Sequence, residues 1–356
     1  MRTKVHSSFT GRELIERGPL NLTAEEAIAA VDQLHQIGIG MDAALVGPAG
    51  GNLGAPVQFL QAWMPGVVRQ VTQIRNIDAL VGVQTIGSWE DEEIIQQASE
   101  LVGKAELYGD ITNIPLANYN PTYERRSVIR FEQGLMLGRL EDARASRQNI
   151  SMQEEKRAAV AESLDIIRNR VGFYGYNLPD TRVFGFLNDP NLPAYQNVAA
   201  GTGGTTWAGK TFEEITADIR EAVTSLITQS GGRVRPQAVD MVLALPLGFE
   251  EYMGVTTTAN GYSVGEWLNK TYPRIRVESS PELAAANGGA NVFYLYAERV
   301  ADSGTDGGDV IAQMVPARFF ALGTEQRAKG IVEDYTNALA GVMVKRPYAV
   351  VRRSGI

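Results

Sequence analysis

The clearest periodic pattern of apolar and polar residues begins at Ser151. Apolar residues recur there at spacings of four, three and four, at Val160, Leu164, Ile167 and Val171. Charged residues occupy the other faces. This spacing predicts a long α-helix with one buried edge. Ser151 and Glu154 have the spacing of a capping box at its start. The glycines and proline of "VGFYGYNLP" predict its end.

A second helical pattern runs from Thr211 to about Gln229, and its apolar face consists of Phe212, Ile215, Ile219, Val223 and Leu226. The next stretch, "AVDMVLALP" (238–246), predicts a fully buried strand. After it, "SVGEWLNKTYP" predicts a short helix, "RIRVES" a strand and "NVFYLYAERV" an alternating strand. "IAQMVPARFFALG" and "GVMVKRPYAVVRRS" predict further strands near the C-terminus. The C-terminal half is therefore α+β, with helices packed on a small sheet.

Residues 92–147 predict two extended segments around a centre rich in turn residues. The first is "IIQQASELVGKAELYG", the centre is "DITNIPLANYNP", and the second is "RRSVIRFEQGLMLG". We expect a long β-hairpin arm, with a helix starting near Glu92 as the alternative.

Residues 1–90 are irregular, apart from a short helix predicted at 24–36. The following "IGIGMDAALVGPAGGNLGAPVQFLQAWMPG" lacks helical or strand periodicity, but it is too apolar for a solvated tail. Trp63 needs burial. A long arm that crosses a neighbouring subunit would satisfy both observations.

The strongest chemical motif is "GTTWAGKT" (204–211), which matches the phosphate-binding P-loop pattern. A working P-loop leaves a buried strand, whereas "NDPNLPAYQNVAAGTG" precedes this one. Thr211 and Glu214 have capping-box spacing, so the carboxylate takes an amide that phosphate would need. No strand ends in an Asp that could organise magnesium. We therefore expect a surface loop feeding a capped helix, with Lys210 exposed and Trp207 anchoring the segment against a core or a neighbouring subunit.

Other candidate chemistry is weaker still. Asp302, Asp306 and Asp309 in "DSGTDGGD" lack the spacing of a calcium loop and predict a solvated turn. The two histidines, His6 and His35, lie in the irregular N-terminal region, which disfavours a catalytic triad. We expect no catalytic residues, no metal site and no cofactor.

Composition narrows the class of protein further. The 356 residues carry a net charge of −8, which disfavours tight binding to nucleic acid. The chain has no cysteine, which excludes disulfides and thiolate metal sites. No apolar stretch predicts a secretory signal or a membrane span, so we expect an aqueous, cytosolic place of synthesis.

An arm, a hairpin arm, a long lone helix and a compact α+β region follow one another, and arms that cannot bury themselves imply a large homo-oligomer. In this order the chain resembles the major capsid proteins of tailed bacteriophages, which have the Hong Kong 97-type fold. The resemblance covers nearly the whole chain and is carried by "YGDITNIPLANYN", "MQEEKRAAVAESLDIIRNRVGFYGYN" and "GFLNDPNLP…TTWAGKTFEEITADI".

The resemblance implies five parts: an N-terminal arm (1–85), an extended β-hairpin loop (86–147), a peripheral domain with the spine helix (148–239), an axial domain (240–320) and strands returning to the peripheral domain (321–356). The helix from Thr211 would pack in the peripheral domain. The implied function is a non-enzymatic shell subunit that self-assembles into hexamers and pentamers around double-stranded DNA.

The implied partners are other copies of the chain, the portal protein and possible scaffold or decoration proteins, with weak, non-specific DNA contact and no membrane. The implied location is the virion capsid, assembled in the cytoplasm of the bacterial host. Residues expected at subunit contacts are Trp63, Lys104, Arg125, Arg126, Arg130 and Trp207. Arg125 and Arg126 are also expected to be salt-bridge donors. Two alternatives remain: an encapsulin-type nanocompartment shell and, more distantly, a P-loop ATPase that uses Gly204–Thr211.

Overall fold

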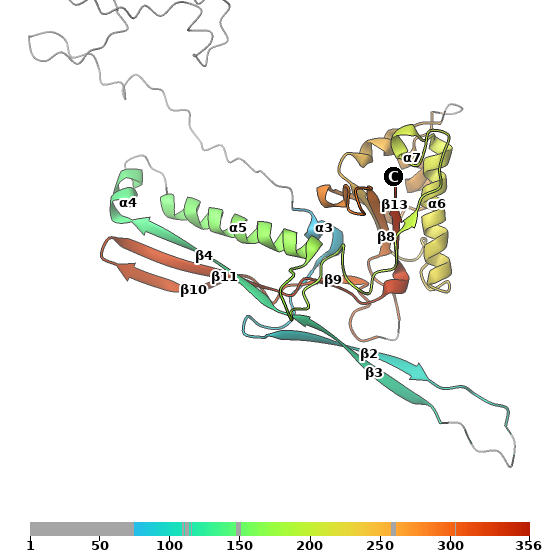
Figure 1. Ribbon diagram of the computed structural model, residues 1–356, viewed down its shortest axis with the longest axis horizontal. Helices are drawn as coiled ribbons and strands as arrows, with labels where there is room; N and C mark the ends of the chain where they lie inside the picture. The colour runs from blue at the N-terminus through green and yellow to red at the C-terminus, as the bar shows by residue number, and fades with distance from the viewer. Residues whose placement is uncertain are drawn as a thin grey trace, which may run out of the picture. The chain divides into compact units, whose positions relative to one another are not determined.

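In the computed structural model the described residues are 75–108, 110, 114, 116–146, 151–257, 261–302 and 304–356. The helix expected at 24–36, both histidines and Trp63 lie outside them. The described chain contains a five-stranded sheet, two three-stranded sheets and a two-stranded hairpin, together with helices (Figure 1). The α+β class predicted from the sequence is thus confirmed.

The five-stranded sheet has the order β5-β13-β8-β6-β7 and contains most of the core. Its strands are β5 (Gln196–Asn197), β6 (Met241–Pro246), β7 (Ile275–Ser280), β8 (Val292–Ala297) and β13 (Val350–Ser354). β6 pairs parallel with β7, and β8 pairs antiparallel with β6 and β13. Helix α6 (Phe212–Gln229) packs on β8 and β13, and α7 (Val264–Thr271) packs against α6. Short 3₁₀ turns lie at Trp207–Gly209, Phe249–Gly254, Pro281–Leu283 and Pro347–Ala349.

Strand β8 differs from its prediction because both of its faces are buried, whereas an alternating strand was expected. Phe293 contacts Trp207 on one face, and Tyr294 and Tyr296 contact Phe186 on the other. Apolar and aromatic residues at successive positions therefore all find partners.

The second sheet has the order β10-β11-β4, with all pairs antiparallel. Its strands are β4 (Ile129–Gly138), β10 (Ala317–Arg327) and β11 (Gly330–Leu339). Helix α5 (Met152–Tyr174) lies along this sheet, and α4 (Arg139–Ser146) joins β4 to the segment before α5 (Figure 1). Val160 and Leu164 of α5 are buried with Leu135 of β4 and Tyr335 of β11, as the apolar stripe predicted.

Helix α5 begins and ends near the predicted positions, with two corrections. The Ser151 hydroxyl donates to the Glu154 carboxylate, in place of the expected reciprocal capping box. Gly172 lies inside the helix and does not end it; the helix stops before Gly175, whose φ is +68°. A Cβ at Gly172 would lie 2.7 Å from Ile77 Cγ1, so this glycine permits the close approach of helix α3 (Ile77–Val81).

Residues 77–84 belong to the folded unit and not to an arm. Ile77 and Leu80 of α3 are buried in the main core. Strand β1 (Val83–Gln84) pairs parallel with β9 (Ile311–Met314), which also pairs antiparallel with β12 (Val342–Val344). The expectation of an arm extending to residue 85 is therefore wrong for this last part.

The hairpin consists of β2 (Glu93–Val102) and β3 (Asn118–Ser127), paired without interruption from Glu93–Ser127 to Val102–Asn118 (Figure 1). The predicted hairpin exists, but its second strand was wrongly placed. "RRS" ends β3, and from Ile129 the chain enters β4, which pairs with β11. β11 was missed because Glu333 and Asp334 interrupt its apolar pattern.

The capsid-type domain boundaries remain a prediction, although two groupings differ from the observed packing. Helix α6 packs on the five-stranded sheet and not beside α5, and β13 belongs to that same sheet. Strand β10, of which residues 321–327 fall in the predicted returning strands, pairs with β11 in the sheet that α5 covers.

Candidate assembly surfaces

The glycine-rich loop at 204–211 is held by close backbone contacts and by hydrogen bonds within its own chain. Gly203 and Gly209 approach so closely that a Cβ on Gly203 would lie 2.4 Å from the Gly209 carbonyl oxygen. The Glu214 carboxylate accepts hydrogen bonds from the N–H groups of Thr211 (2.9 Å) and Thr202 (2.6 Å) and from the Thr202 hydroxyl (2.8 Å). These bonds lower the pKa of Glu214 to about 2, so a permanent negative charge occupies the helix start. The capping role predicted for Glu214 is confirmed.

Lys210 is not the exposed residue that the sequence predicted. Its side chain is buried, and Nζ donates to Asp218 Oδ2 at 2.6 Å and to the Ala199 carbonyl at 2.8 Å. The indole N–H of Trp207 donates to the same carboxylate at 2.9 Å. A lysine held in this way cannot reach a nucleotide phosphate. Burial raises the pKa of Asp218, while the hydrogen bond from Lys210 opposes that rise.

Trp207 is 1% exposed and contacts Phe293 and Phe249. Of the two anchors expected for it, the structure supports the core of its own chain. The buried indole offers no surface to a neighbouring subunit, contrary to the intersubunit contact predicted for Trp207.

The base of the hairpin is held by an ion-pair network around Arg126, whose side chain is fully buried. Its guanidinium donates to Asp189 at 2.7 Å and to Glu124, and it lies over the Phe184 ring. The Asp189 carboxylate also accepts the N–H of Val344. Arg126 is therefore a salt-bridge donor as predicted, but within its own chain, so the expected intersubunit contact is corrected here too.

Two other predicted contact residues lie near this base with exposed side chains. Arg125 forms an ion pair with Glu93 across the hairpin at 3.8 Å. Arg130 lies on β4, outside the hairpin, and donates to the carbonyl oxygens of Trp89 (2.7 Å) and Asp91 (2.9 Å). Lys104 is exposed beyond the end of β2. Their roles at subunit contacts stay predictions.

The tip of the hairpin presents apolar side chains to solvent. Four of the described residues between the two strands are 83–97% exposed: Leu107, Tyr108, Ile114 and Leu116. Soluble proteins normally cover a group of large apolar side chains of this kind, and exposed apolar patches mark interaction sites. Lys104, Glu106 and Asp110 supply the charges around them.

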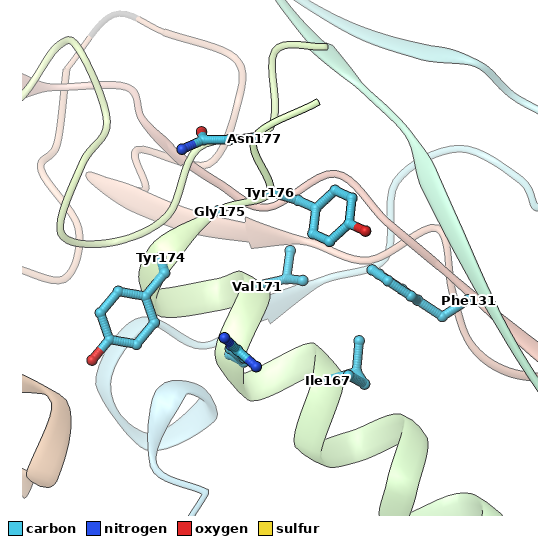
Figure 2. Close-up of a pocket in the computed structure, with 8 residues that line it drawn as sticks. Phe131, Ile167, Val171, Tyr174, Gly175, Tyr176 and Asn177 are labelled. Carbon is cyan, nitrogen blue, oxygen red and sulfur yellow. The ribbon is translucent and has the colours of Figure 1, made fainter. Parts of the chain in front are cut away.

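A concave aromatic surface lies at the C-terminal end of α5 and encloses a cavity of about 610 Å³ (Figure 2). Phe131, Ile167, Val171 and Tyr176 form one side of it in Figure 2, and the Phe131 and Tyr176 rings meet edge to face at 5.4 Å. Arg170, Tyr174 and Asn177 add polar groups, and all three residues are exposed. We call this surface the aromatic pocket. No pattern in the sequence indicates this pocket, because its residues come from β4, α5 and the segment that follows α5.

The family described as "Pa193 gp26 major capsid protein" matches residues 48–355. The chain belongs to this family. It is a structural subunit of a tailed-phage capsid, part of the virion shell, and not an enzyme. The family match also favours a phage shell over the nanocompartment alternative.

Solved structures support the fold of this capsid protein. The capsid of Myoviridae phage XM1 is similar with a TM-score of 0.67 at 16% identity, over 86% of this chain and 100% of that one. The capsid of an empty GTA particle has a TM-score of 0.55 at 9% identity, over 84% and 96%. The capsid of cyanophage P-SCSP1u has a TM-score of 0.52 at 10% identity, over 88% and 99%. No curated protein matches the chain in sequence.

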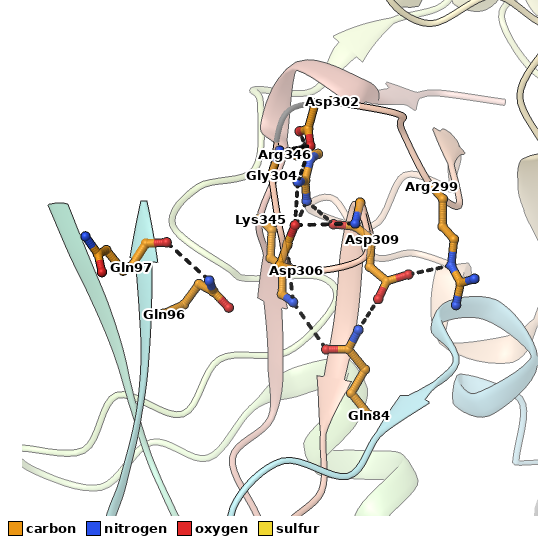
Figure 3. A network of polar contacts seen from close by, with 11 residues as sticks. Gln84, Gln96, Gln97, Arg299, Asp302, Gly304, Asp306, Asp309, Lys345 and Arg346 are labelled. Carbon is orange, nitrogen blue, oxygen red and sulfur yellow. Dashed lines mark hydrogen bonds and ion pairs between the residues drawn. The ribbon is translucent and has the colours of Figure 1, made fainter. Parts of the chain in front are cut away.

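The acidic turn at 302–309 is more ordered in this capsid protein than the solvated loop that was predicted. Arg346, only 7% exposed, is held by Asp302 (2.6 and 3.0 Å) and Asp306 (2.7 and 3.0 Å), as Figure 3 shows. Its guanidinium lowers the pKa of both carboxyls. Asp309 instead pairs with Arg299 at 2.8 Å and accepts from Gln84. These carboxylates thus neutralise arginines, and the described residues contain no acidic or histidine cluster arranged to hold a metal.

Several structurally important residues had little signal in the sequence. Asp189, Arg346 and Glu333 meet their partners only through long-range packing. Asp218 is an exception, because a charged residue on the apolar face of a helix, beside Ile215 and Ile219, indicates a buried ion pair. Among the described residues no helix is long and apolar enough to span a membrane.

Proposed function

We propose that this capsid protein assembles through its β2–β3 hairpin into hexameric and pentameric capsomers of an icosahedral shell around double-stranded DNA. The observation that carries this proposal is the exposed apolar tip of the hairpin. Four large apolar side chains that the described part of the subunit leaves in water need a neighbour to bury them. Burial of each would contribute roughly 1.5–3 kcal/mol, and a closed shell repeats the contact many times.

The interior of such a shell would contact its DNA weakly and without sequence preference. A net charge of −8 supports this, because tight duplex binding requires clusters of Lys and Arg that release counterions. The other proposed partners are the portal protein and scaffold or decoration proteins, and the proposed place of assembly is the cytoplasm of the bacterial host. Lys104, Arg125 and Arg130 are proposed as polar contacts between subunits.

The proposal is tested by sedimentation velocity and negative-stain microscopy of the purified full chain. We expect shells, tubes or ring-shaped capsomers. A monomer or dimer across a wide range of protein concentration would contradict the proposal. Titration with duplex DNA at about 0.15 M salt, near physiological ionic strength, should show weak binding with no preference among sequences.

A further inference from the structure

We propose that the aromatic pocket binds a small organic acid, a molecule with one aromatic or branched aliphatic body and one carboxylate. The apolar body would lie against Phe131, Ile167 and Val171 (Figure 2), and the carboxylate would pair with Arg170. All the residues that line the pocket belong to one subunit, so this binding site does not depend on the proposed assembly.

The walls of the pocket are fixed by contacts within the chain before any ligand binds. The Gly175 N–H donates to the Val171 carbonyl at 2.8 Å, and the Tyr176 N–H donates to the Val183 carbonyl at 3.0 Å. A Cβ on Gly175 would lie 2.4 Å from the same Val183 oxygen, so these two segments pack in direct contact. A site that is already formed loses less free energy to ordering when a ligand binds.

The inner surface of the pocket is apolar and can cover an organic ring. Val171 is buried, and the rings of Phe131 and Tyr176 meet edge to face at 5.4 Å. Tyr176 is nevertheless 39% exposed, so a bound ligand would remove apolar surface from water. The volume of about 610 Å³ lies within the range of sites that bind small molecules.

Arg170 supplies the charge that selects an anion. Two other arginines of α5 are engaged inside the subunit, since Arg157 pairs with Glu333 and Arg168 pairs with Asp78. In the described part of the chain Arg170 is exposed, lines the pocket and makes neither an ion pair nor a hydrogen bond. A guanidinium can hold a carboxylate through two parallel hydrogen bonds, which the single ammonium of a lysine cannot do.

The rest of the rim also favours an anion. Burial raises the pKa of the Tyr174 phenol, with a further rise from Glu282 that Arg170 opposes, so the hydroxyl remains a hydrogen-bond donor at neutral pH. The Asn177 amide is exposed and has no hydrogen-bond partner among the described residues. None of the described residues that line the pocket is acidic. A carboxylate in the pocket would therefore meet donors along the rim.

Only a ligand with both parts uses both features of the pocket. A neutral apolar molecule would leave the charge of Arg170 in water, and an inorganic anion such as phosphate would leave the apolar surface uncovered. A cation would be repelled by Arg170. The combination therefore points to an acid with an organic body.

Naphthoate, with naphthamide as its neutral counterpart of nearly the same size, tests this proposal on the purified full chain. Equilibrium dialysis and ligand-observed NMR measure the two dissociation constants. We expect saturable binding of one naphthoate per chain, and binding of naphthamide weaker by about tenfold or more, because the charged hydrogen bonds to Arg170 are lost. Equal affinities for the two ligands, or naphthoate binding that does not saturate, would overturn the proposal.

Variants locate the binding site. Arg170→Gln should weaken naphthoate binding by about tenfold or more and leave naphthamide binding unchanged. Ile167→Ala should weaken the binding of both ligands, and Tyr176→Ala, at an exposed ring, replaces it if that variant does not fold. Arg144→Gln is the matched control, because it removes the same charge from an exposed arginine of α4 that does not line the pocket. It should bind both ligands as the unaltered protein does.

Equal losses of naphthoate binding in Arg144→Gln and Arg170→Gln would indicate a general attraction to surface charge and would overturn the assigned site. Unchanged binding in Arg170→Gln and in the apolar variant would overturn it as well. Particle formation is scored separately. A chain that forms particles but binds no naphthoate would overturn this inference and leave the proposed function intact, whereas a chain that binds naphthoate but forms no particles would overturn only the proposed function.

Discussion

At the scale of single residues, the buried charges of Lys210, Arg126 and Arg346 hold segments of the chain together through ion pairs. Lys210 is the clearest example. Its position in "GTTWAGKT" suggests a phosphate ligand, yet its ammonium binds Asp218 in the core beside Trp207. The motif therefore serves packing within the core, and the P-loop ATPase alternative lacks the free lysine that it requires.

Replacing Lys210 by Ala should destabilise the protein by about 3–5 kcal/mol, because the buried Asp218 carboxylate loses its charged partner. Denaturant unfolding measures the loss. The paired variant Lys210→Met with Asp218→Leu should lose much less, since it removes both charges. Lys329→Ala, at an exposed turn, is the matched control and should be near neutral. An unchanged stability in Lys210→Ala would contradict the buried pair, and ATP binding should be absent from every variant.

Glu333 makes stability depend on pH. The guanidinium of Arg157, with Tyr335 and Gln153, lowers its pKa from an ordinary value of 4.5 to about 2. The unfolded chain therefore binds this proton at higher pH than the folded chain does. The stabilisation is fully present above pH 4.5 and is lost as the pH falls toward 2.

Glu333→Gln should accordingly be less stable at pH 7 and should show a shallower fall in stability between pH 4.5 and 2. Urea unfolding at a series of pH values measures this. Glu214, Asp302 and Asp306 also have lowered pKa values, so the variant should retain part of the fall. Identical pH profiles for the variant and the unaltered protein would rule out the role assigned to Glu333.

At the scale of elements, apolar periodicity predicted the helices well and strand partners poorly. Helices α5 and α6 lie where their stripes place them, since helical hydrogen bonds are local. Strand β4 was assigned to the hairpin because it follows β3 directly. It pairs instead with β11, almost 200 residues later, and that choice depends on the packing of α5 over both strands.

The contact between α3 and α5 gives a prediction at this scale. Gly172→Ala should destabilise the protein by about 1–3 kcal/mol, because the new methyl group would lie 2.7 Å from Ile77 Cγ1 and 3.0 Å from Gln313 Nε2. Helix propensity alone predicts the opposite sign, a gain of about 1 kcal/mol.

Thermal or denaturant unfolding decides between the two signs. Ile77→Ala removes the atom that clashes, so the double variant should lose less than the sum of the two single losses. A Gly172→Ala protein more stable than the original would show that α3 can move away from the new methyl group at little cost in free energy.

At the scale of the whole molecule, folding and assembly depend on different parts of the chain. The main core lies around the five-stranded sheet, while the outer hairpin buries little of its own apolar surface. Replacing residues 99–121 by Asn-Gly would join Ala98 to Thr122, which already face each other across the hairpin.

The shortened protein should keep its unfolding temperature within a few degrees, because the deleted side chains contribute little to the core. It should also fail to form particles in sedimentation and microscopy. A control that keeps the hairpin length and replaces Gln97 by Thr should assemble normally. Particles of ordinary yield from the shortened chain would show that the hairpin is dispensable.

The sequence by itself determined the α+β class, the two long helices, the buried strand β6, the existence of a hairpin and the resemblance to phage capsid subunits. These follow from local periodicity and from the order of segments along the chain. Only the tertiary structure decided that Lys210 and Arg126 are buried, that β4 pairs with β11, that Arg346 organises the acidic turn, and that an aromatic pocket forms at the end of α5. All of these except the burial of Lys210, whose partner Asp218 lies eight positions away, depend on contacts between residues far apart in the chain. The spacing of residues along a sequence carries no record of such long-range contacts.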